Sequence, residues 1–553
     1  MAVSRDKKEL LYIGLFCLFV AGLWLLFYLP YIKQQILGID TAAYIIGAQK
    51  ILSGGVLYND FIDNKPPLIF FLFALVLKIF GRENFIALNC ITLCALISIS
   101  FCIAIILSHL KVPWFQRVVI VCMHIVLHNV LLSHSAVEPN TEIFMTLFAL
   151  LGVYLSLRRT AERKWGWVVA SGMSFGIAVG FKQPAVFMII VVLTSFLLYG
   201  TDFKWGYIFK QSLCFCAGFF AVWSILCIYF FSYGVGFRFL FICFGFSFVY
   251  GSTMSFGTIL IRYAVMMIKF IKTYPFLFGI YCFSLLSSVY FLARKDIPKN
   301  VWKIIALFFL WHILDTGAVM LGGLFFLHYF VQWIPSFVMI TSIPFFLFGE
   351  RLSSINRKKV MAIMTGYLCI VMMYMASIRC RSGIINYTPP VSVYKDYRNY
   401  YEQYGSSFYA YPASMWMSWF NMISELVQYT QHYVLPDQTL LVWGFRPELY
   451  LMCRRQPATR FIHTGMITGD FLFMKNIYES SPAKGEATRK EFERMLFDDL
   501  HTKPPHMVIV EDTKRSPDSK PFWDYIALNF TKVYLNPQLP YELYVLKPER
   551  DKT

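Results

Sequence analysis

Acidic residues are scarce in the first two thirds of this chain, and several of them gather in two short stretches. Asp40 stands in GIDTAAY, Asp63 and Lys65 stand in DNKPP, and Glu138 and Glu142 stand in VEPNTEIF. A carboxylate can take a proton from a hydroxyl, and a lysine ammonium can neutralise a departing phosphate. Transfer of a sugar from a lipid-linked phosphate donor to an acceptor hydroxyl is one reaction that would use these residue types, with one carboxylate as the base.

Two further stretches place polar residues at the ends of apolar segments. Lys182 and Gln183 stand in GFKQPAVF, and His328 and Tyr329 stand in FLHYF. We expect Lys182 and Lys65 to meet an interfacial phosphate, although snorkelling to lipid headgroups explains Lys182 equally well. His328 is more ordinarily interpreted as a histidine at the membrane interface whose hydrogen bonds are made within the protein. Its role in binding substrate therefore stays open.

The local backbone signals beside these residues also have structural interpretations. Asp is a favoured N-cap residue, so Asp40 could cap a helix that begins at Thr41. That role and a catalytic role can coexist. Pro66 and Pro67 restrict the backbone next to Lys65, which would hold this lysine in a defined turn.

The composition places these residues in a membrane protein. The chain has 553 residues, of which 58% are hydrophobic and 15% are charged, too few charges to coat several soluble domains. The net charge of +18 would suggest nucleic-acid binding if the basic residues shared one soluble face. They lie instead in short loops between apolar segments, as the positive-inside rule expects, and nucleic acid is excluded as a partner.

The apolar segments predict roughly eleven transmembrane helices. These segments are 11–31, 86–108, 118–133, 141–157, 166–181, 184–200, 207–231, 275–293, 301–320, 328–349 and 359–379. The first follows a basic start, but it is long enough to span and lacks the small-residue cleavage site of a signal peptide. With the N-terminus inside, the basic loops fall on one side of the membrane. The first outer loop (32–85), the second outer loop (133–140) and everything after 379 then fall on the other.

The run from 66 to 80 is apolar but does not fit this alternation as a span. Counting it would invert every later loop, so we predict a helix that lies at the outer surface or dips partly into it. Residues 1–379 then form the membrane-embedded catalytic module.

Residues 380–553 are more charged and predict a soluble outer domain. LLVWG, TRFIH, MVIVED, KVYLN and YELYVL are typical of short buried strands, and PELYLM, RKEFERMLFDDL and WDYIAL are typical of helices. This alternation predicts a small α/β domain. Cys380 and Cys453 lie outside the apolar runs, and whether they pair is left open.

Several of these strings resemble the family 39 type of membrane glycosyltransferase, which includes the protein O-mannosyltransferases and the lipid A aminoarabinose transferases. The resembling strings are DTAAYIIGAQKILSGGVLYNDFIDNKPPLIFFLFAL, VEPNTEIFMTLFALLGVYL, GFKQPAVF, GGLFFLHYFVQWIPSF and VWGFRPELYLMCRRQPATRF. The resemblance implies a polytopic α-helical membrane protein of the GT-C fold with a C-terminal extracytoplasmic α/β domain. It also implies a bacterial inner-membrane location, with the active site on the periplasmic side.

By this resemblance, Asp40 matches the catalytic base or acceptor-binding acid, and Glu138 matches the acid that completes the acceptor side. Lys65 matches the lysine that meets the polyprenyl phosphate. The sequence departs from the family in two places. Asp40 is followed by Thr41 where many relatives have a second acid, so that acid is either dispensable or supplied by Asp63. LHYF lacks the proline-histidine pair of the nearest relatives.

VWGFRPELY in the predicted outer domain has two interpretations. Arg446 and Glu448 could contribute to a lid or an acceptor platform over the site. The simpler interpretation is a buried turn in which Arg446 and Glu448 form an ion pair within the domain.

The sequence as a whole predicts a glycosyltransferase that moves one sugar from a polyprenyl-phosphate donor to an extracytoplasmic hydroxyl, with inversion. Asp40 and Glu138 are the predicted catalytic residues, and Lys65 and Lys182 the predicted phosphate-binding residues. The predicted substrate-binding residues are Asp63, Glu142, Gln183, His328, Tyr329 and Arg446. We expect no cofactor and no structural metal, although a divalent ion between carboxylates and phosphate is left open.

Two other classes of protein are weighed against this prediction. A transporter or flippase of lipid-linked saccharides would carry ionisable groups near mid-membrane and repeated halves. A non-catalytic scaffold would tolerate carboxylate-to-amide changes. The identity of the sugar, the acceptor (lipid A, another glycan or a protein), the oligomeric state and the role of the C-terminal domain are left open by the sequence.

Overall fold

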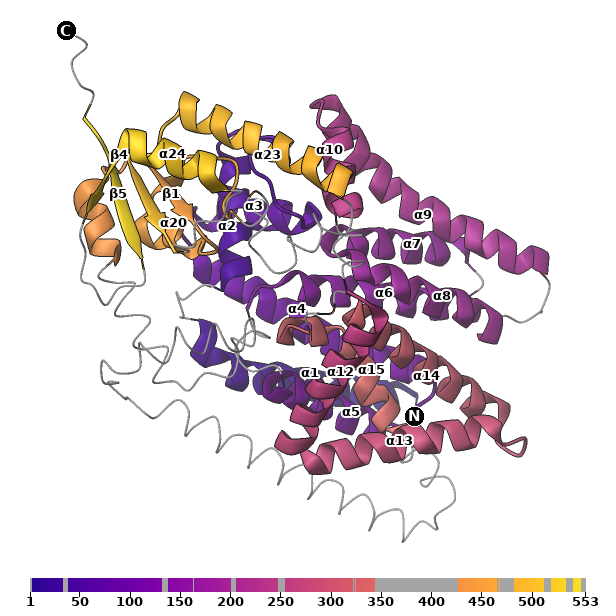
Figure 1. The fold of residues 1–553 in the computed structure, drawn as a ribbon. Helices are drawn as coiled ribbons and strands as arrows, with labels where there is room; N and C mark the ends of the chain where they lie inside the picture. Colours follow the sequence, from indigo (N-terminus) through magenta and orange to yellow (C-terminus); the bar gives the residue numbers. More distant parts are fainter. Residues whose placement is uncertain are drawn as a thin grey trace.

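The protein consists of a bundle of long apolar helices with a small sheet-containing domain at one end (Figure 1). The computed structural model describes residues 2–32, 38–131, 138–162, 164–199, 205–246, 254–321, 323, 325–343, 426–464, 467, 482–511, 519–533 and 541–548. The predicted span 359–379 and Cys380 lie outside these residues. The domain boundary at 379/380 therefore stays a prediction.

The helices of the bundle follow one another in chain order. They are α1 (Ala2–Ile32), α2 (Ile39–Leu52), α3 (Leu68–Phe80), α4 (Phe85–His109), α5 (Trp114–Leu131), α6 (Thr141–Glu162), α7 (Trp165–Phe181), η2 (Gln183–Ala185), α8 (Val186–Tyr199), α9 (Trp205–Ser232), α10 (Gly236–Leu240), the π-helix η3 (Phe241–Phe246), α12 (Phe256–Thr273), α13 (Pro275–Ala293), α14 (Lys299–Met320), η4 (Leu327–Val331) and α15 (Trp333–Thr341).

The predicted spans from 11–31 to 301–320 each overlap one of these helices, and the next predicted span begins as η4 followed by α15. Within the described residues, 4 helices are both long and apolar enough to cross a membrane: α4, α6, α9 and α14. Several shorter apolar helices lie beside them. The prediction of a polytopic helical membrane protein is confirmed, and the exact count of spans stays a prediction.

Helices α6, α7 and α9 pack side by side, and small residues lie where α7 and α9 meet. A Cβ atom placed on Gly172 of α7 would lie 2.0 Å from the carbonyl oxygen of Phe215 in α9. A Cβ placed on Gly218 of α9 would lie 2.1 Å from the carbonyl oxygen of Val169 in α7. Lipid offers no hydrophobic drive for helix association, so close backbone packing of this kind holds membrane helices together.

The apolar run after DNKPP forms α3, a helix of 13 residues. At about 1.5 Å per residue it is roughly 20 Å long, shorter than the ~30 Å hydrocarbon core of a bilayer. It packs against α2, where the Tyr44 ring meets Phe70 and Phe73 edge-on with centroids 5.8 and 6.0 Å apart. The predicted helix is confirmed, and its length favours a helix that does not span.

The C-terminal domain contains a five-stranded sheet in the order β2-β1-β3-β5-β4. Its strands are β1 (Thr439–Trp443), β2 (Gln456–Pro457), β3 (Met507–Val510), β4 (Phe530–Val533) and β5 (Glu542–Leu546), and its helices are α20 (Glu448–Cys453), α23 (Pro482–Thr502) and α24 (Lys520–Asn529). Strand β1 is parallel to β2 and β3, whereas β5 is antiparallel to β3 and β4. The predicted α/β domain is therefore confirmed.

One predicted strand of this domain is wrong. TRFIH does not join the sheet, because its backbone pairs with the loop between α2 and α3 instead. The backbone N–H of Ile62 donates to the carbonyl oxygen of Arg460 (2.9 Å), and Ile62 and Phe461 form an isolated parallel bridge.

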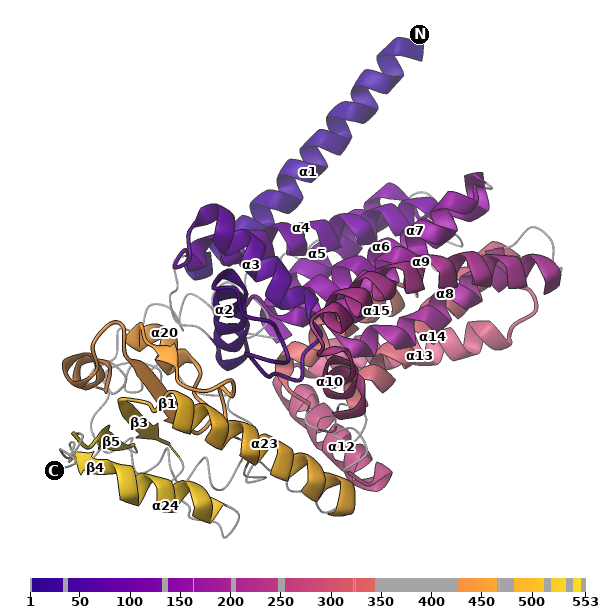
Figure 2. The ribbon, with the colours of Figure 1, turned by 90° about the horizontal axis from the view of Figure 1, so that it is seen from above.

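The C-terminal domain lies against the bundle through several elements. Figures 1 and 2 show α2 between the sheet and the long helices, and α23 running from the sheet toward α10. Glu491 of α23 approaches Arg238 of α10 (3.9 Å), and Arg454 approaches Glu83 (3.7 Å). The first of these contacts lies beside the loop between α2 and α3, because Arg238 also donates to the carbonyl oxygen of Tyr58 (3.3 Å).

Candidate active site

Asp40 lies in the first turn of α2 and faces two cationic or ionisable side chains. Its carboxylate oxygens lie 3.8 Å from the Nζ atom of Lys65 and 3.6 Å from the Nε2 atom of His328. The N-cap of α2 is Gly38, so the cap role considered for Asp40 is wrong. A carboxylate in the first turn is still favoured by the helix dipole.

The charge of Asp40 is set by competing effects. Burial raises the pKa of its carboxyl, but Lys65 and His328 more than offset burial, so the pKa lies below its ordinary value. Its side chain keeps 31% of its surface exposed. Asp40 is therefore an ionised carboxylate whose side chain remains partly open to its surroundings.

Lys65 is held by the turn that contains it. Its backbone N–H donates to Oδ1 of Asp63 (2.9 Å), and its carbonyl oxygen accepts from the hydroxyl of Tyr58 (2.8 Å). The amide of Gln183 donates to the carbonyl oxygens of Asn64 (3.4 Å) and Cys243 (2.7 Å). Asp63 and Gln183, predicted to bind substrate, thus contact the backbone that positions Lys65.

A second ion pair lies beside the first. Lys182 pairs with Glu142 at the start of α6, and its ammonium lies 4.0 Å from the centroid of the Tyr329 ring. The Nε2 atom of His328 lies 3.5 Å from Glu142 and so stands between the carboxylates of Glu142 and Asp40. The structure thus brings together residues from α2, the DNKPP turn, α6, the α7–α8 corner and η4.

Glu138 lies beside the start of α2, the helix that carries Asp40. A Cβ atom placed on Gly38 would lie 2.1 Å from Oε2 of Glu138, so this carboxyl packs directly on the start of α2. Burial, with repulsion from Asp40 and Glu448, raises the pKa of Glu138 to about 8. Glu138 is therefore protonated at neutral pH and can donate a hydrogen bond.

Arg446 belongs to an ion-pair network inside the C-terminal domain. It contacts Glu448 (3.3 Å) and Glu511 (2.7 Å), as the simpler interpretation of VWGFRPELY expected. Burial raises the pKa of Glu448 to about 7, although Arg446 opposes the change. Glu448, rather than Arg446, is the residue of this string that acts electrostatically on Glu138.

No cluster of three or more His, Cys, Asp or Glu side chains with the arrangement of a metal site occurs among the residues that the structure describes. The expectation that no cofactor is needed stays a prediction.

Comparison with known families supports the sequence resemblance. Residues 64–231 match the family model of the dolichyl-phosphate-mannose-protein mannosyltransferases. The matched segment covers less than half of the chain. It contains Lys65, Glu138, Glu142 and Lys182, and therefore carries both ion-pairing lysines of the site and two of its carboxyls.

Two solved structures resemble the chain over most of its length. ArnT from Cupriavidus metallidurans bound to undecaprenyl phosphate shares 12% identity, with a TM-score of 0.47, and the match covers 96% of this chain and 97% of that one. The archaeal oligosaccharyltransferase AglB from Archaeoglobus fulgidus, in complex with an inhibitory peptide and a dolichol-phosphate, shares 10% identity, with a TM-score of 0.48 and coverage of 98% and 74%. No curated protein matches the chain.

The candidate site includes His463, which no pattern in the sequence singles out, and Glu448, considered only as part of VWGFRPELY. His463 lies 3.9 Å from Asp63, and Glu448 acts on Glu138. Burial lowers the pKa of His463, although Asp63 opposes the change. His463 ends the TRFIH string, and nothing in the sequence around it indicates its approach to Asp63.

Proposed function

We propose that the protein transfers a single sugar from a polyprenyl-phosphate donor to an acceptor hydroxyl on the extracytoplasmic face of the membrane, with inversion at the anomeric carbon. The observation that carries this proposal is the close approach of Asp40 to Lys65 beside the pair of Glu142 and Lys182. A carboxylate next to two lysines suits attack by a hydroxyl on a carbon that leaves a phosphate.

In the proposed reaction, Asp40 takes the proton of the acceptor hydroxyl as its oxygen bonds to the anomeric carbon. The bond from that carbon to the phosphate oxygen breaks, and its electron pair stays on the polyprenyl phosphate. Lys65 and Lys182 neutralise the charge that develops there. The match of residues 64–231 to the dolichyl-phosphate-mannose-protein mannosyltransferase family supports this choice of donor.

The ion pair between Asp40 and Lys65 couples donor binding to the strength of the base. Lys65 is the largest of the charges that lower the pKa of Asp40, ahead of His328 and Lys182. When a phosphate draws Lys65 toward itself, Asp40 loses part of that stabilisation and its pKa rises. Asp40 would then become a stronger base only when the donor is in place.

Glu138 and His328 complete the acceptor side of the proposed site. Protonated Glu138 can donate a hydrogen bond to Asp40 or to the acceptor oxygen, which would orient the attacking hydroxyl. His328 lies between two carboxylates and would hold Asp40 at a fixed distance from Glu142.

The test is transfer from a panel of radiolabelled polyprenyl-phosphate sugars by purified protein in lipid nanodiscs, with crude cell envelope as acceptor. Lys65→Ala and the surface variant Lys520→Ala are assayed beside the wild type. We expect transfer from one donor by the wild type and Lys520→Ala, and strong loss in Lys65→Ala. Folded wild-type protein that transfers from no donor would contradict the proposal and make lipid flux the next assay.

A further inference from the structure

Residues 459–464 of the C-terminal domain contact the loop that carries the DNKPP turn. The N–H of Ile62 donates to the carbonyl oxygen of Arg460, and Ile62 and Phe461 are only 1% and 2% exposed. A buried backbone hydrogen bond between two such distant segments fixes their relative position. The C-terminal segment is therefore anchored to the loop between α2 and α3.

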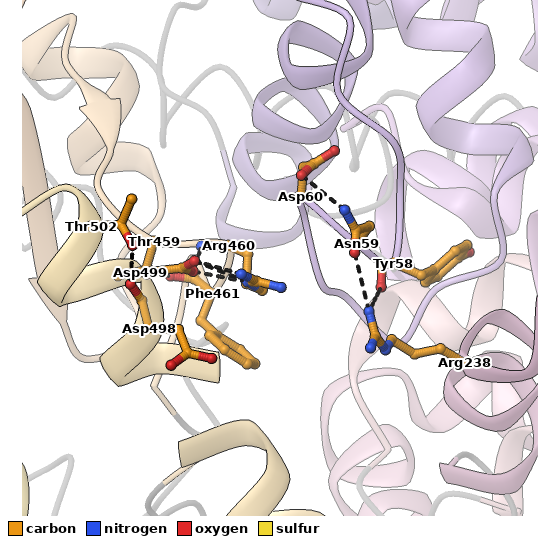
Figure 3. Close-up of polar contacts among 10 residues, drawn as sticks. All are labelled: Tyr58, Asn59, Asp60, Arg238, Thr459, Arg460, Phe461, Asp498, Asp499 and Thr502. Carbon is orange, nitrogen blue, oxygen red and sulfur yellow. Dashed lines mark hydrogen bonds and ion pairs between the residues drawn. The ribbon is translucent and has the colours of Figure 1, made fainter. Parts of the chain in front are cut away.

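The shape of this C-terminal segment is fixed from within its own domain. The guanidinium of Arg460 binds both carboxylate oxygens of Asp499 in α23 (2.6 and 2.9 Å), and Asp499 also accepts from the Arg460 backbone N–H (2.9 Å). The hydroxyl of Thr459 donates to the carbonyl oxygen of Phe461 (2.8 Å). Figure 3 shows this cluster on the side of the domain that faces Asp60 and the loop of the bundle. The segment therefore meets the loop in a preformed conformation.

His463 follows directly and reaches the carboxylate that holds Lys65. Its Nε2 atom lies 3.9 Å from Oδ2 of Asp63, while Oδ1 of Asp63 accepts from the backbone N–H of Lys65. The His463 ring rests on Phe445 of its own domain, with centroids 4.8 Å apart. Asp63 is 4% exposed, so water does not replace a lost neighbour freely.

We propose that His463 is a positioning residue that acts through Asp63 to aim the ammonium of Lys65 at the lipid phosphate. This inference rests on the proposed function. His463 keeps the Asp63 carboxylate in the orientation that binds the Lys65 backbone, and docking of the C-terminal domain is thereby required for a competent donor site. The domain is then part of the donor-binding machinery.

The test measures binding of undecaprenyl phosphate to the full-length protein in nanodiscs, together with the KM values for donor and acceptor. In His463→Ala we expect donor affinity to fall a few-fold, because a contact of 3.9 Å is weaker than a hydrogen bond, with the acceptor KM unchanged. His463→Gln keeps a donor near the position of Nε2 and should restore most of the affinity. His432→Ala, an exposed histidine of the same domain, is the matched control and should bind like the wild type.

A double-mutant cycle with Asp63→Ala separates positioning from general destabilisation. If His463 acts through Asp63, adding His463→Ala to Asp63→Ala should cause no further loss of lipid affinity. Should His463→Ala fail to fold, His463→Asn replaces it, because its shorter amide does not reach Asp63.

Three outcomes separate this inference from the proposed function. Wild-type binding and transfer with an unchanged His463→Ala variant would overturn the inference and leave the proposed function standing. Additive losses in the cycle, or equal losses of donor and acceptor affinity, would also overturn the inference. A wild-type protein that neither binds undecaprenyl phosphate nor transfers sugar would overturn both.

Discussion

The Nζ atom of Lys65 lies 3.8 Å from Oδ1 of Asp40, so the proposed phosphate-binding cation and the proposed base form one ion pair. The pair keeps the pKa of Asp40 low, so Asp40 is a weak base until a phosphate competes for Lys65. Such an arrangement links the two halves of a transfer reaction, because the acceptor is activated only after the donor has bound.

The ion pair predicts that removing the charge of Asp40 strengthens donor binding but slows sugar transfer. In Asp40→Asn, Lys65 is released for the phosphate, so undecaprenyl phosphate should bind a few-fold more tightly than to the wild type, by about 1 kcal/mol or less. Titration of the lipid into purified variant in nanodiscs measures this. Weaker binding by Asp40→Asn would show that Asp40 helps to hold the donor.

Lys182 and Glu142 form the more buried of the two ion pairs, so removing one partner should cost stability as well as activity. In Lys182→Ala, the carboxylate of Glu142, 2% exposed, loses its main counter-charge, and we expect a loss of about 3 kcal/mol of stability. Lys182→Ala combined with Glu142→Gln should recover much of the thermal midpoint. A midpoint equal to that of the wild type in the single variant would contradict this account of the pair.

Glu138 should make stability depend on pH above the ordinary pKa of a glutamate. Because its folded-state pKa is raised to about 8, the folded protein retains a proton that the unfolded chain has already lost, and stability falls as the pH rises from about 4.5 through about 8. Glu138→Gln removes this dependence. Its thermal midpoint should exceed that of the wild type by more at about pH 9 than at about pH 5, and a difference that does not change with pH would contradict the prediction.

The contact between α7 and α9 should tolerate no side chain at its centre. In Gly172→Val, the new Cβ would collide with the carbonyl oxygen of Phe215, and we expect a loss of about 1–3 kcal/mol from forced separation of the helices. Gly166→Val, at a glycine with open space around it, is the matched control. Thermal unfolding in detergent compares the two, and equal midpoints would show that the helices separate without cost.

The residues that the sequence identified are those whose signal is local. Asp40, Lys65 and Glu138 stand in short strings with characteristic neighbours, and Lys182 stands at a predicted corner between apolar segments. Hydropathy and loop charge place these four residues at the same membrane interface. That is sufficient to predict that they lie close to one another. The pairing of Lys182 with Glu142 and the position of His328 between two carboxylates required the fold.

The part that sequence could not provide depends on docking between distant segments. TRFIH has the alternating pattern of a strand, and nothing local shows that Ile62 binds its backbone instead of a neighbouring strand. The approach of His463 to Asp63 follows from that docking. Glu448 was recognised as a partner of Arg446, but its effect on Glu138 depends on how α20 packs on α2.

The most direct test of the central claim is single-turnover transfer by Asp40→Asn with saturating lipid-linked donor and acceptor. Because the amide cannot take a proton, we expect the rate of sugar transfer to fall at least about 100-fold while donor binding is kept or strengthened. That separation of chemistry from binding is the result that a base held by Lys65 predicts. Transfer by folded Asp40→Asn protein at the wild-type rate would contradict the account.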